Sequence, residues 1–591
     1  MNRHFFMNLL VVQILPMRNI YNIKKKVRFL NLIIGSLVLI FSSCRSKNSE
    51  NKKKKDLRPN ILIVMLDDLG FSDISCYGSE IPTPNIDRLA KNGLLYTHFR
   101  NAARCCPSRA SLMTGLYPHR AGLGHMMNDL GHEGYKGDLS LSTVTIAEAL
   151  KMVGYNTYMA GKWHLTRFTD PNASNHNWPL QRGFDEFFGT LPGYGSQYKP
   201  AGLMEGNKFI DPQEDFFYTE ALTDKSISYI EKASESENPF FLYLSYTAPH
   251  YPLHAKEGFI AKHRGRFSKG WDSLRIQRFN RLKGLGIIPL TTELSDRDGM
   301  GIPWEEEPNK AWQESRMEAY SGMIEHVDQG IGRILSALIK NEQLDNTLIF
   351  FLSDNGGSAE GHLNNTVERW GTPWRSKLIP EKTKDGQKVT SGDFVGLELG
   401  PENTFGSYGP QWSNLSNAPF RMHKNWVHEG GISTPFIVHW PNGIIDRGKL
   451  RHQSGHIMDI MATCLEVSGG TYPTEYNGHA IKPLQGVSLV PSFEDNPLNR
   501  NEPLFWEHEG NRAVIKGKWK LVSAYPGSWS NMMEFKNKGN WELYNLDTDR
   551  TETNNLSKFY PELVEELTNA WQHWADKKGV VDYKELDLEI Y

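Results

Sequence analysis

Residues 61–66 have the sequence Ile-Leu-Ile-Val-Met-Leu, and Asp67 and Asp68 follow them directly. An unbroken apolar run of this length is typical of a parallel β-strand that is buried on both faces of a sheet. Similar runs occur at residues 240–244 (FFLYL), 348–352 (LIFFL) and 436–438 (FIV). Amphipathic helical patterns lie between the runs, at residues 143–153, 312–339 and 457–467. The alternation of the two patterns predicts an α/β sandwich.

Charged or imidazole-bearing motifs come after four of the predicted strands. They are Asp67-Asp68 after residues 61–66, Gly161-Lys162-Trp163-His164 after 155–160, Ala248-Pro249-His250 after 240–244, and Asp354-Asn355-Gly356-Gly357 after 348–352. In open parallel sheets, ligand sites lie outside the carboxyl ends of the strands. One such motif alone would be interpreted as a turn or a helix cap. Four of them in one chain predict a single site in which they converge.

Four of these residues are candidate metal ligands. Asp67, Asp68, Asp354 and Asn355 all offer oxygen donors, and no Cys or His pair with zinc-binding spacing lies near them. Hard oxygen ligands select Ca²⁺ or Mg²⁺ over Zn²⁺. A strand-ending turn would explain the Asp354 motif if it stood alone. Together with the Asp pair, it favours a metal site.

Composition and length set the outer limits. The chain of 591 residues is long enough for one large domain and a smaller one. Its 66 Lys and Arg against 68 Asp and Glu leave a formal charge of −2, so we expect no nucleic-acid partner.

The last part of the chain has a different pattern. Short alternating segments at residues 505–508, 512–515, 519–522 and 541–546 predict an antiparallel meander, and residues 561–574 predict a helix.

The N-terminus has the features of a bacterial lipoprotein signal, which we assign to residues 1–44. Lys24–Lys26 precede an apolar run at residues 29–41 that is too short to span a bilayer comfortably. The sequence Phe-Ser-Ser-Cys then ends at Cys44 and resembles a lipobox, in which the cysteine carries the lipid. A plain cleaved signal or an uncleaved anchor is the alternative.

Residues 45–57 are polar and basic, and we interpret them as a tether. A lipid anchor at Cys44 would give the protein its only contact with a membrane. We therefore expect an exported lipoprotein in the periplasm, or attached to the outer membrane at the cell surface.

The most specific motif begins at Cys105. Residues 105–115 read CCPSRASLMTG and match the pattern C-x-P-S-R-x-x-L-x-T-G. This pattern resembles that of the type I sulfatases, the arylsulfatase-like family of the alkaline phosphatase superfamily. The resemblance runs from about Arg58 to the C-terminus. Its other motifs are Asp67-Asp68-Leu69-Gly70, Gly161-Lys162-Trp163-His164, Ala248-Pro249-His250, Ser353-Asp354-Asn355-Gly356, and Lys424 followed by Glu429-Gly430-Gly431.

The resemblance implies the alkaline phosphatase-like fold, with a large mixed, mainly parallel sheet sandwiched by helices. It places the catalytic domain at residues 58–471. A smaller α+β subdomain with a four-stranded antiparallel sheet would follow at residues 472–591. Residues 258–310 contain no clear pattern, and we interpret them as an irregular insertion that shapes the pocket.

The resemblance also implies a cofactor and a modification. In this family the first cysteine of the motif is oxidised by a separate maturing enzyme to Cα-formylglycine, here formylglycine-105. One Ca²⁺ would be held by Asp67, Asp68, residue 105, Asp354 and Asn355. A hydroxyl of the hydrated aldehyde attacks sulfur and displaces the alcohol. The second hydroxyl then loses its proton and sulfate is expelled, which a serine could not achieve.

The remaining side chains receive roles by the same resemblance. Lys162 and Lys424 would hold the sulfate oxygens, and Arg109 would orient the hydrate. His164 would take the second proton, and His250 would protonate the leaving oxygen. Candidate substrate contacts are Trp163, Tyr194, Tyr246, Trp370, Trp426, Glu507, His508, Glu509 and Arg512.

We therefore predict a sulfuric ester hydrolase that acts, in an exo fashion, on a sulfated saccharide of host or algal origin. Two alternatives stay open. The first is a phosphoesterase or phosphonate hydrolase of the same superfamily. The second is a non-catalytic glycan-binding lipoprotein, although every expected catalytic residue is present.

Overall fold

The computed structural model describes residues 57–297, 301–361, 378–525 and 539–586. The predicted signal segment, Cys44 and all of the tether except Leu57 lie outside the described residues. No helix in the described part of the chain combines the length and the apolar character needed to cross a bilayer.

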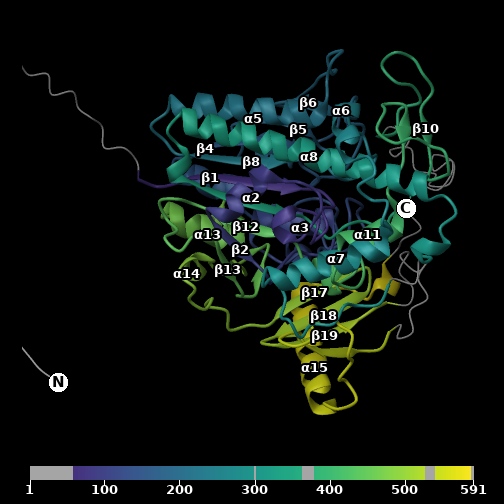
Figure 1. The fold of residues 1–591 in the computed structure, drawn as a ribbon. Coiled ribbons are helices and arrows are strands. Elements are labelled where there is room, and N and C mark those ends of the chain that lie inside the picture. The colour runs from purple at the N-terminus through teal and green to yellow at the C-terminus, as the bar shows by residue number, and fades with distance from the viewer. Residues whose placement is uncertain (1–56, 298–300, 362–377, 526–538, 587–591) are drawn as a thin grey trace, which may run out of the picture. The chain divides into compact units, whose positions relative to one another are not determined.

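The core is a ten-stranded sheet in the order β13-β2-β12-β9-β1-β8-β4-β5-β6-β7 (Figure 1). The strands are β1 (Asn60–Leu66), β2 (Leu94–Tyr96), β4 (Asn156–Lys162), β5 (Glu186–Thr190), β6 (Leu203–Glu205), β7 (Lys208–Phe209), β8 (Phe240–Ser245), β9 (Thr347–Ser353), β12 (Phe436–His439) and β13 (Lys449–Arg451). The five central strands, from β9 to β5, are parallel. Their carboxyl ends therefore meet at one edge, as the motifs require.

Strand β12 corrects one expectation. Residues 436–438 were expected to form a parallel strand, but β12 runs antiparallel to both β9 and β2. Phe436 pairs with Leu352 near the carboxyl end of β9, so the chain enters β12 directly from the edge that carries the site. A parallel strand would require the chain to cross first to the opposite edge of the sheet, and before β12 it does not do so. An apolar run reports burial on both faces and carries no information about direction.

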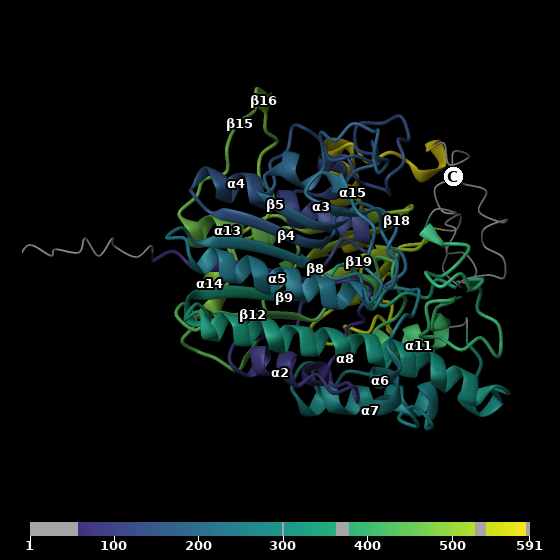
Figure 2. The same cartoon turned by 90° about the horizontal axis from the view of Figure 1, so that it is seen from above.

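Alternate residues of β1 pack into two different apolar clusters. Leu62, Val64 and Leu66 lie with residues of α2 (Pro84–Lys91), α5 (Tyr218–Ser234) and α8 (Lys310–Lys340). Ile61, Ile63 and Met65 lie with residues of α3 (Cys105–Thr114), α4 (Ile146–Met152) and α13 (Asp459–Ser468). Figure 2 shows α3, α4 and α13 on one side of the sheet and α2 and α8 on the other. The predicted helices and the sandwich are confirmed.

Residues 258–310 are not an irregular insertion. They contain most of α6 (Glu257–Ile260), then η4 (Ala261–His263), α7 (Gly270–Gly284) and η5 (Trp304–Glu306). Trp271 and Trp304 pack edge to face, with ring centroids 4.7 Å apart, against Trp412 of α11 (Gly409–Ser416). The arginines of α7 obscured its apolar face in the sequence because Arg278 is buried there on Asp73 and Glu80.

The C-terminal meander is confirmed. Strands β17 (Leu504–His508), β18 (Asn511–Lys516), β19 (Trp519–Ser523) and β20 (Glu542–Asn545) form an antiparallel sheet in sequence order. Helix α15 (Pro561–Lys578) packs on this sheet and buries Leu567, Trp571 and Trp574 (Figure 1). Upstream of it, Leu489 and Phe493 belong to an apolar cluster of the large sheet.

A buried charged group joins the two sheets. Glu429, on the short helix α12 (Glu429–Ile432), accepts hydrogen bonds of 2.9 and 3.0 Å from Arg100 of β3 (Phe99–Arg100). Lys520 of β19 lies 3.0 Å from Glu429 and 2.7 Å from Glu552. Burial alone would raise the pKa of Glu429, but the charges of Arg100 and Lys520 outweigh it and hold the pKa well below its usual range. Glu429 is therefore ionised and fully paired.

We predict that Glu429→Ala lowers the free energy of unfolding by about 3–5 kcal/mol, because the buried Arg100 and Lys520 lose their shared partner. Urea-induced unfolding followed by tryptophan fluorescence measures the change. Glu566→Ala is the control, since its bridge to Lys516 has both side chains more than half exposed. That substitution should change stability by at most about 1 kcal/mol. Equal effects of the two substitutions would contradict the role given to Glu429.

Candidate active site

Two neighbouring strands supply the acidic part of the site. Asp67 and Asp68 leave the end of β1, Asp354 and Asn355 leave the end of β9, and Leu66 pairs with Ser353 just before them. The amide of Asn355 donates to Asp68 Oδ1 over 2.6 Å, and the backbone N–H of Asp68 donates to Asp354 Oδ1 over 3.3 Å. All four side chains are buried. The parallel register of the two strands therefore assembles them.

Each carboxylate has its own cationic partner. Lys162, at the end of β4, lies 2.6 Å from Asp67, and Lys424 lies 3.0 Å from Asp68. Burial by itself would lower the pKa of Lys162, but the charge of Asp67 outweighs it and raises the pKa. The charges of Asp67 and Asp68 are thus largely neutralised by lysines from distant parts of the chain.

Arg109 of α3 is the partner of Asp354, with two N–H groups 2.7 and 3.0 Å from one carboxylate oxygen. Its remaining N–H groups donate to Ser245, Tyr243 and the carbonyl of Lys162. Burial and the nearby charge of Asp67 raise the pKa of Asp354 to about 6, in spite of Arg109. Arg109 therefore fixes the position of Asp354 and adds positive charge to the first half of α3, the helix that begins at Cys105.

The residues fit a hard cation. Asp67 Oδ1 and Asn355 Oδ1 are buried, yet neither accepts a hydrogen bond from any residue that the structure describes. Buried oxygen atoms of this kind normally have a partner. The donor set contains only carboxylate and amide oxygens, which Ca²⁺ and Mg²⁺ prefer. Asp67, Asp68, Asp354 and Asn355 would hold such an ion.

Cys105 is the first residue of α3, and the encoded thiol stands where an oxidised side chain would stand. It is only 2% exposed. The hydrogen bond with Cys106 lowers the pKa of the Cys105 thiol, and the positive charge of Lys162 and the nearby imidazole of His164 lower it further; together they outweigh burial. The free N–H groups of the first helical turn add to this positive environment. Position 105 is therefore a site that stabilises an anion.

The two histidines face different parts of the site. His164 follows β4, a nitrogen of its imidazole lies within 4.8 Å of Cys105 Sγ, and burial lowers its pKa to about 4. His250 donates from Nδ1 to the carbonyl of Tyr251 over 2.6 Å, which turns Nε2 toward the site. That nitrogen lies 3.3 Å from Lys424 Nζ and 3.5 Å from Asp68. All predicted site residues thus lie in one connected group.

The backbone is strained beside these side chains. Asp68, Ala103, His164 and Asn425 have φ angles of 63°, 68°, 57° and 79°. Residues other than glycine rarely adopt such angles, which cluster where function requires a fixed geometry. The sequence contained no signal for this feature.

Comparison with known proteins agrees with this geometry. A family model described as Sulfatase matches residues 59–470, and one described as N-sulphoglucosamine sulphohydrolase, C-terminal, matches residues 420–576. The chain belongs to the sulfatase family. An uncharacterized sulfatase of Schizosaccharomyces pombe is 34% identical over 562 residues, which cover 90% of this chain and 96% of that protein. The arylsulfatase of Klebsiella aerogenes is 34% identical over 453 residues, covering 73% and 91%.

Among solved structures, Ps i-CgsB in complex with k-i-k-neocarrahexaose matches with a TM-score of 0.60 and 25% identity, covering 88% of this chain and 93% of that one. The predicted enzyme class and the alkaline phosphatase superfamily are confirmed: the protein is a sulfatase that hydrolyses sulfate esters.

The predicted aromatic contacts of the sulfatase differ in where they lie. Tyr194 stacks on His250 with ring centroids 5.4 Å apart. Trp163 and Tyr246 are fully buried core residues, so the expectation that they contact substrate is wrong. Trp426 lies in a small cluster with Met422 and Ala524, and Trp370 lies outside the described residues.

The four polar residues that were predicted to contact substrate from the C-terminal sheet lie in different surroundings. Glu507 bonds to His119 over 2.7 Å, and Arg512 lies over the rings of Trp541 and Trp571. Of these four residues, Glu509 is the one that contacts a neighbour of Cys105, since it accepts a hydrogen bond of 2.5 Å from Arg104. His508 lies 3.7 Å from Glu509. Two further residues near the site, Arg104 and Glu360, had no signal in the sequence; Glu360 lies 3.1 Å from Lys424.

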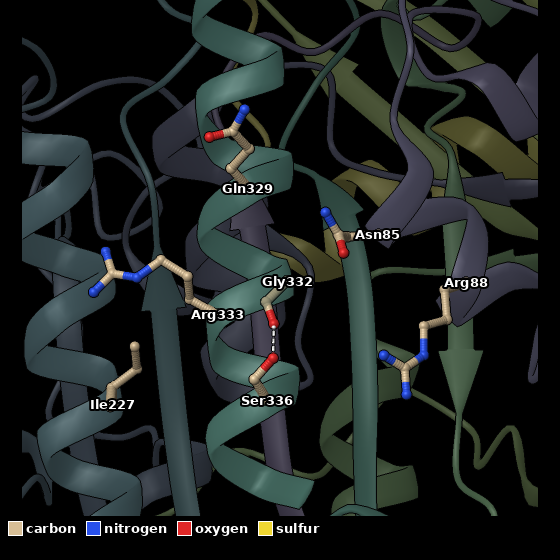
Figure 3. A pocket seen from close by; sticks show the side chains of 7 residues that line it. All are labelled: Asn85, Arg88, Ile227, Gln329, Gly332, Arg333 and Ser336. Carbon is tan, nitrogen blue, oxygen red and sulfur yellow. Dashed lines mark hydrogen bonds between the residues drawn. The ribbon is translucent and has the colours of Figure 1, made fainter.

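A separate surface pocket lies among α2, α5 and α8 of the sulfatase (Figure 3). It is lined by Asn85, Arg88, Ile227, Gln329, Gly332, Arg333 and Ser336. Arg333 is paired there with Asp224 at 2.5 Å. None of the residues of the active site lines this pocket.

We predict that Gly193→Ala reduces the kcat of the sulfatase about 100-fold, because small displacements of reacting groups have effects of this size. A Cβ at position 193 would lie 2.4 Å from Cε1 and 2.5 Å from Nε2 of His164, so the imidazole must move. Gly195→Ala is the matched control, since its Cβ would meet nothing closer than 3.4 Å. Steady-state kinetics of both variants tests the prediction, and equal activities would contradict it.

Proposed function

We propose that this sulfatase releases inorganic sulfate from a sulfated saccharide, using formylglycine at position 105 and one Ca²⁺. The observation that carries the proposal is the setting of residue 105. It begins a buried helix, and its Sγ atom lies within 4.8 Å of a ring nitrogen of His164. It is close enough to Asp354 to act on it electrostatically, and Asp67 Oδ1 and Asn355 Oδ1 accept no hydrogen bond from the described residues. Such a setting supports an anionic nucleophile next to a metal ion.

Two groups absent from the encoded chain would contribute chemistry. Formylglycine would supply an aldehyde whose hydrate offers both the attacking oxygen and the oxygen that later expels sulfate. Ca²⁺ would supply a positive charge that favours deprotonation of the nucleophile.

The side chains of the site would bind the sulfate group. Lys162 lies against Asp67 and Lys424 against Asp68, and each presents an ammonium group that can contact sulfate oxygens. Arg109 would keep Asp354 in place, because its donors already lie on that carboxylate and on its neighbours. Positioning and charge would then be supplied before the substrate arrives.

Proton transfers would fall to the two histidines. His164 contacts residue 105 and is neutral at pH 7, so it can accept the proton of the second hydroxyl. His250 presents Nε2 beside Lys424 and Asp68, where it can donate a proton to the leaving oxygen once both ring nitrogens are protonated. The leaving alcohol would therefore depart on the side of His250.

Aromatic side chains and a structural relative support a saccharide substrate. Tyr194 and Tyr251 flank His250 and offer ring faces for a sugar. Ps i-CgsB is a structural relative with an oligosaccharide bound. None of the proposed catalytic and metal-binding residues is more than 5% exposed, which favours an ester at the end of a saccharide chain and hence exo action. We also propose export, a lipid anchor at Cys44, and maturation by a formylglycine-generating enzyme.

We predict that peptide mass spectrometry of protein from its native host finds a loss of roughly 18 Da at Cys105, the thiol-to-aldehyde change. The same preparation should release sulfate from an aryl sulfate and leave the matching phosphate ester largely intact. Cys105→Ala should abolish turnover, whereas the buried neighbour variant Cys106→Ala should keep it. An unmodified Cys105 in active native protein would contradict the proposal, and faster phosphate release would favour a phosphoesterase.

We also predict that chelation with EGTA lowers the melting temperature of the sulfatase and that added Ca²⁺ restores it. The reason is that an ion held by Asp67, Asp68, Asp354 and Asn355 binds only the folded state and stabilises it by mass action. Asp354→Asn should show a much smaller response to the chelator, because the variant has one carboxylate fewer. Differential scanning calorimetry measures this without reference to activity. A wild-type protein that does not respond to EGTA would contradict a calcium site.

A further inference from the structure

A second charged group lies next to the active site and has no part in the chemistry described above. Arg104, which precedes Cys105, contacts Glu509 over 2.5 Å and Glu360 over 3.2 Å. Glu509 lies in the turn between β17 and β18, and Glu360 follows β9 by several residues. We call Arg104, Glu360 and Glu509 the Arg104 cluster. It joins three distant parts of the chain at one point.

Glu360 connects this cluster to the active site. Its Oε2 atom lies 3.1 Å from Lys424 Nζ and accepts a hydrogen bond of 3.0 Å from Tyr251. Lys424 in turn contacts His250, the proposed acid for the leaving oxygen. A sugar whose leaving oxygen is protonated by His250 would therefore have its ring beside Lys424. Glu360 contacts Lys424 and would be close to that ring.

Two members of the cluster, Arg104 and Glu360, are more accessible than Asp68 and Lys424, whereas Glu509 is only 1% exposed. The side chains of Arg104 and Glu360 are 8% and 11% exposed, whereas those of Asp68 and Lys424 are 3% and 2% exposed. The intermediate exposure of Tyr194 and Tyr251 places these rings at the same level. A ring attached to a bound sulfate would meet these side chains first.

The charges of the cluster determine what it can bind. Arg104 is shared by two carboxylates, and Lys424 is shared by Asp68 and Glu360. Burial would raise the pKa of Glu360, but Lys424 and Arg104 outweigh it and keep this side chain ionised. His125 and His508 lie 3.4 and 3.7 Å from Glu509, and burial lowers the pKa of His508 to about 4.

No cation of the cluster is therefore left to pair with a second anionic group of a substrate. A carboxylate such as Glu360 does accept hydrogen bonds from sugar hydroxyls, and these charge-assisted bonds are among the stronger ones. A second sulfate or a uronate at the same place would be repelled. Such repulsion of wrong substrates is a common source of specificity.

Building on the proposed function, we propose that Glu360 binds a free hydroxyl beside the sulfated position of the substrate ring. Arg104 and Lys424 hold Glu360, and Glu509 positions Arg104. The sulfatase is thereby selective for sugar rings that carry a single sulfate.

The test compares mature full-length protein with its Glu360→Gln and Glu509→Gln variants. The probes are 4-nitrophenyl sulfate, which offers no hydroxyl, and the positional isomers of galactose, glucose and N-acetylglucosamine monosulfate. The disulfated form of the best monosulfated sugar is the last probe. Glu305→Gln is the matched control, because the side chain of Glu305 is 92% exposed on η5.

We expect Glu360→Gln to reduce kcat/KM for the best sugar about 10- to 100-fold more than kcat/KM for the aryl sulfate, as the loss of a charge-assisted hydrogen bond implies. The preference for the monosulfated over the disulfated sugar should shrink about tenfold in the same variant. Glu509→Gln should change both ratios in the same direction by a smaller factor. Glu305→Gln should leave both ratios unchanged.

Three results would overturn the inference. The first is an equal loss on the sugar and the aryl sulfate in Glu360→Gln, which would leave Glu360 only as a support for Lys424. The second is a wild-type preference for the disulfated sugar. The third is turnover of the aryl sulfate but of no monosulfated sugar, in which case the sulfatase chemistry stands without this recognition site. If formylglycine-containing protein cleaves neither class, the proposed function itself fails.

Discussion

The structure depends on the pairing of buried carboxylates at one edge of the large sheet. Asp67, Asp68 and Asp354 lie at the ends of two adjacent strands and are almost completely buried. Charges in such a place are tolerated only when they are paired and hydrogen-bonded. Arg109, Lys162 and Lys424 provide that pairing. The helix, the strand and the loop that carry these cations are therefore tied to the same edge.

This arrangement also explains the local backbone. Lys162 follows Gly161, whose φ of 120° and close approach to the carbonyl of Ser245 leave no room for a side chain. Asp68 and His164 have φ angles of 63° and 57°, which cost about 1–3 kcal/mol each in isolation. The surrounding ion pairs and packed strands hold these conformations. Strain is accepted at the points where a side chain must be aimed.

The C-terminal sheet takes part in the site as well as packing beside it. Lys520 of β19 forms an ion pair with Glu429, which lies five residues after Lys424 in the chain. Glu509 reaches Arg104 at the start of the helix that carries position 105. Residues that are hundreds of positions apart thus support the same few side chains. A sulfatase of this kind needs both sheets to complete its active site.

The sequence alone determined the strands β1, β4, β8 and β9, the helices α4, α8, α13 and α15, and the residues that would converge at the strand ends. Local periodicity and short motifs carry that information, because burial repeats every two or 3.6 residues along a chain. Only the tertiary structure decided that β12 runs antiparallel, that residues 258–310 contain the helix α7 and shorter helical turns, and that Trp163 and Tyr246 belong to the core. It alone showed Arg104, Glu360 and Glu509 together. These outcomes depend on which distant segments pair, and no local pattern records the position of a partner that lies hundreds of residues away.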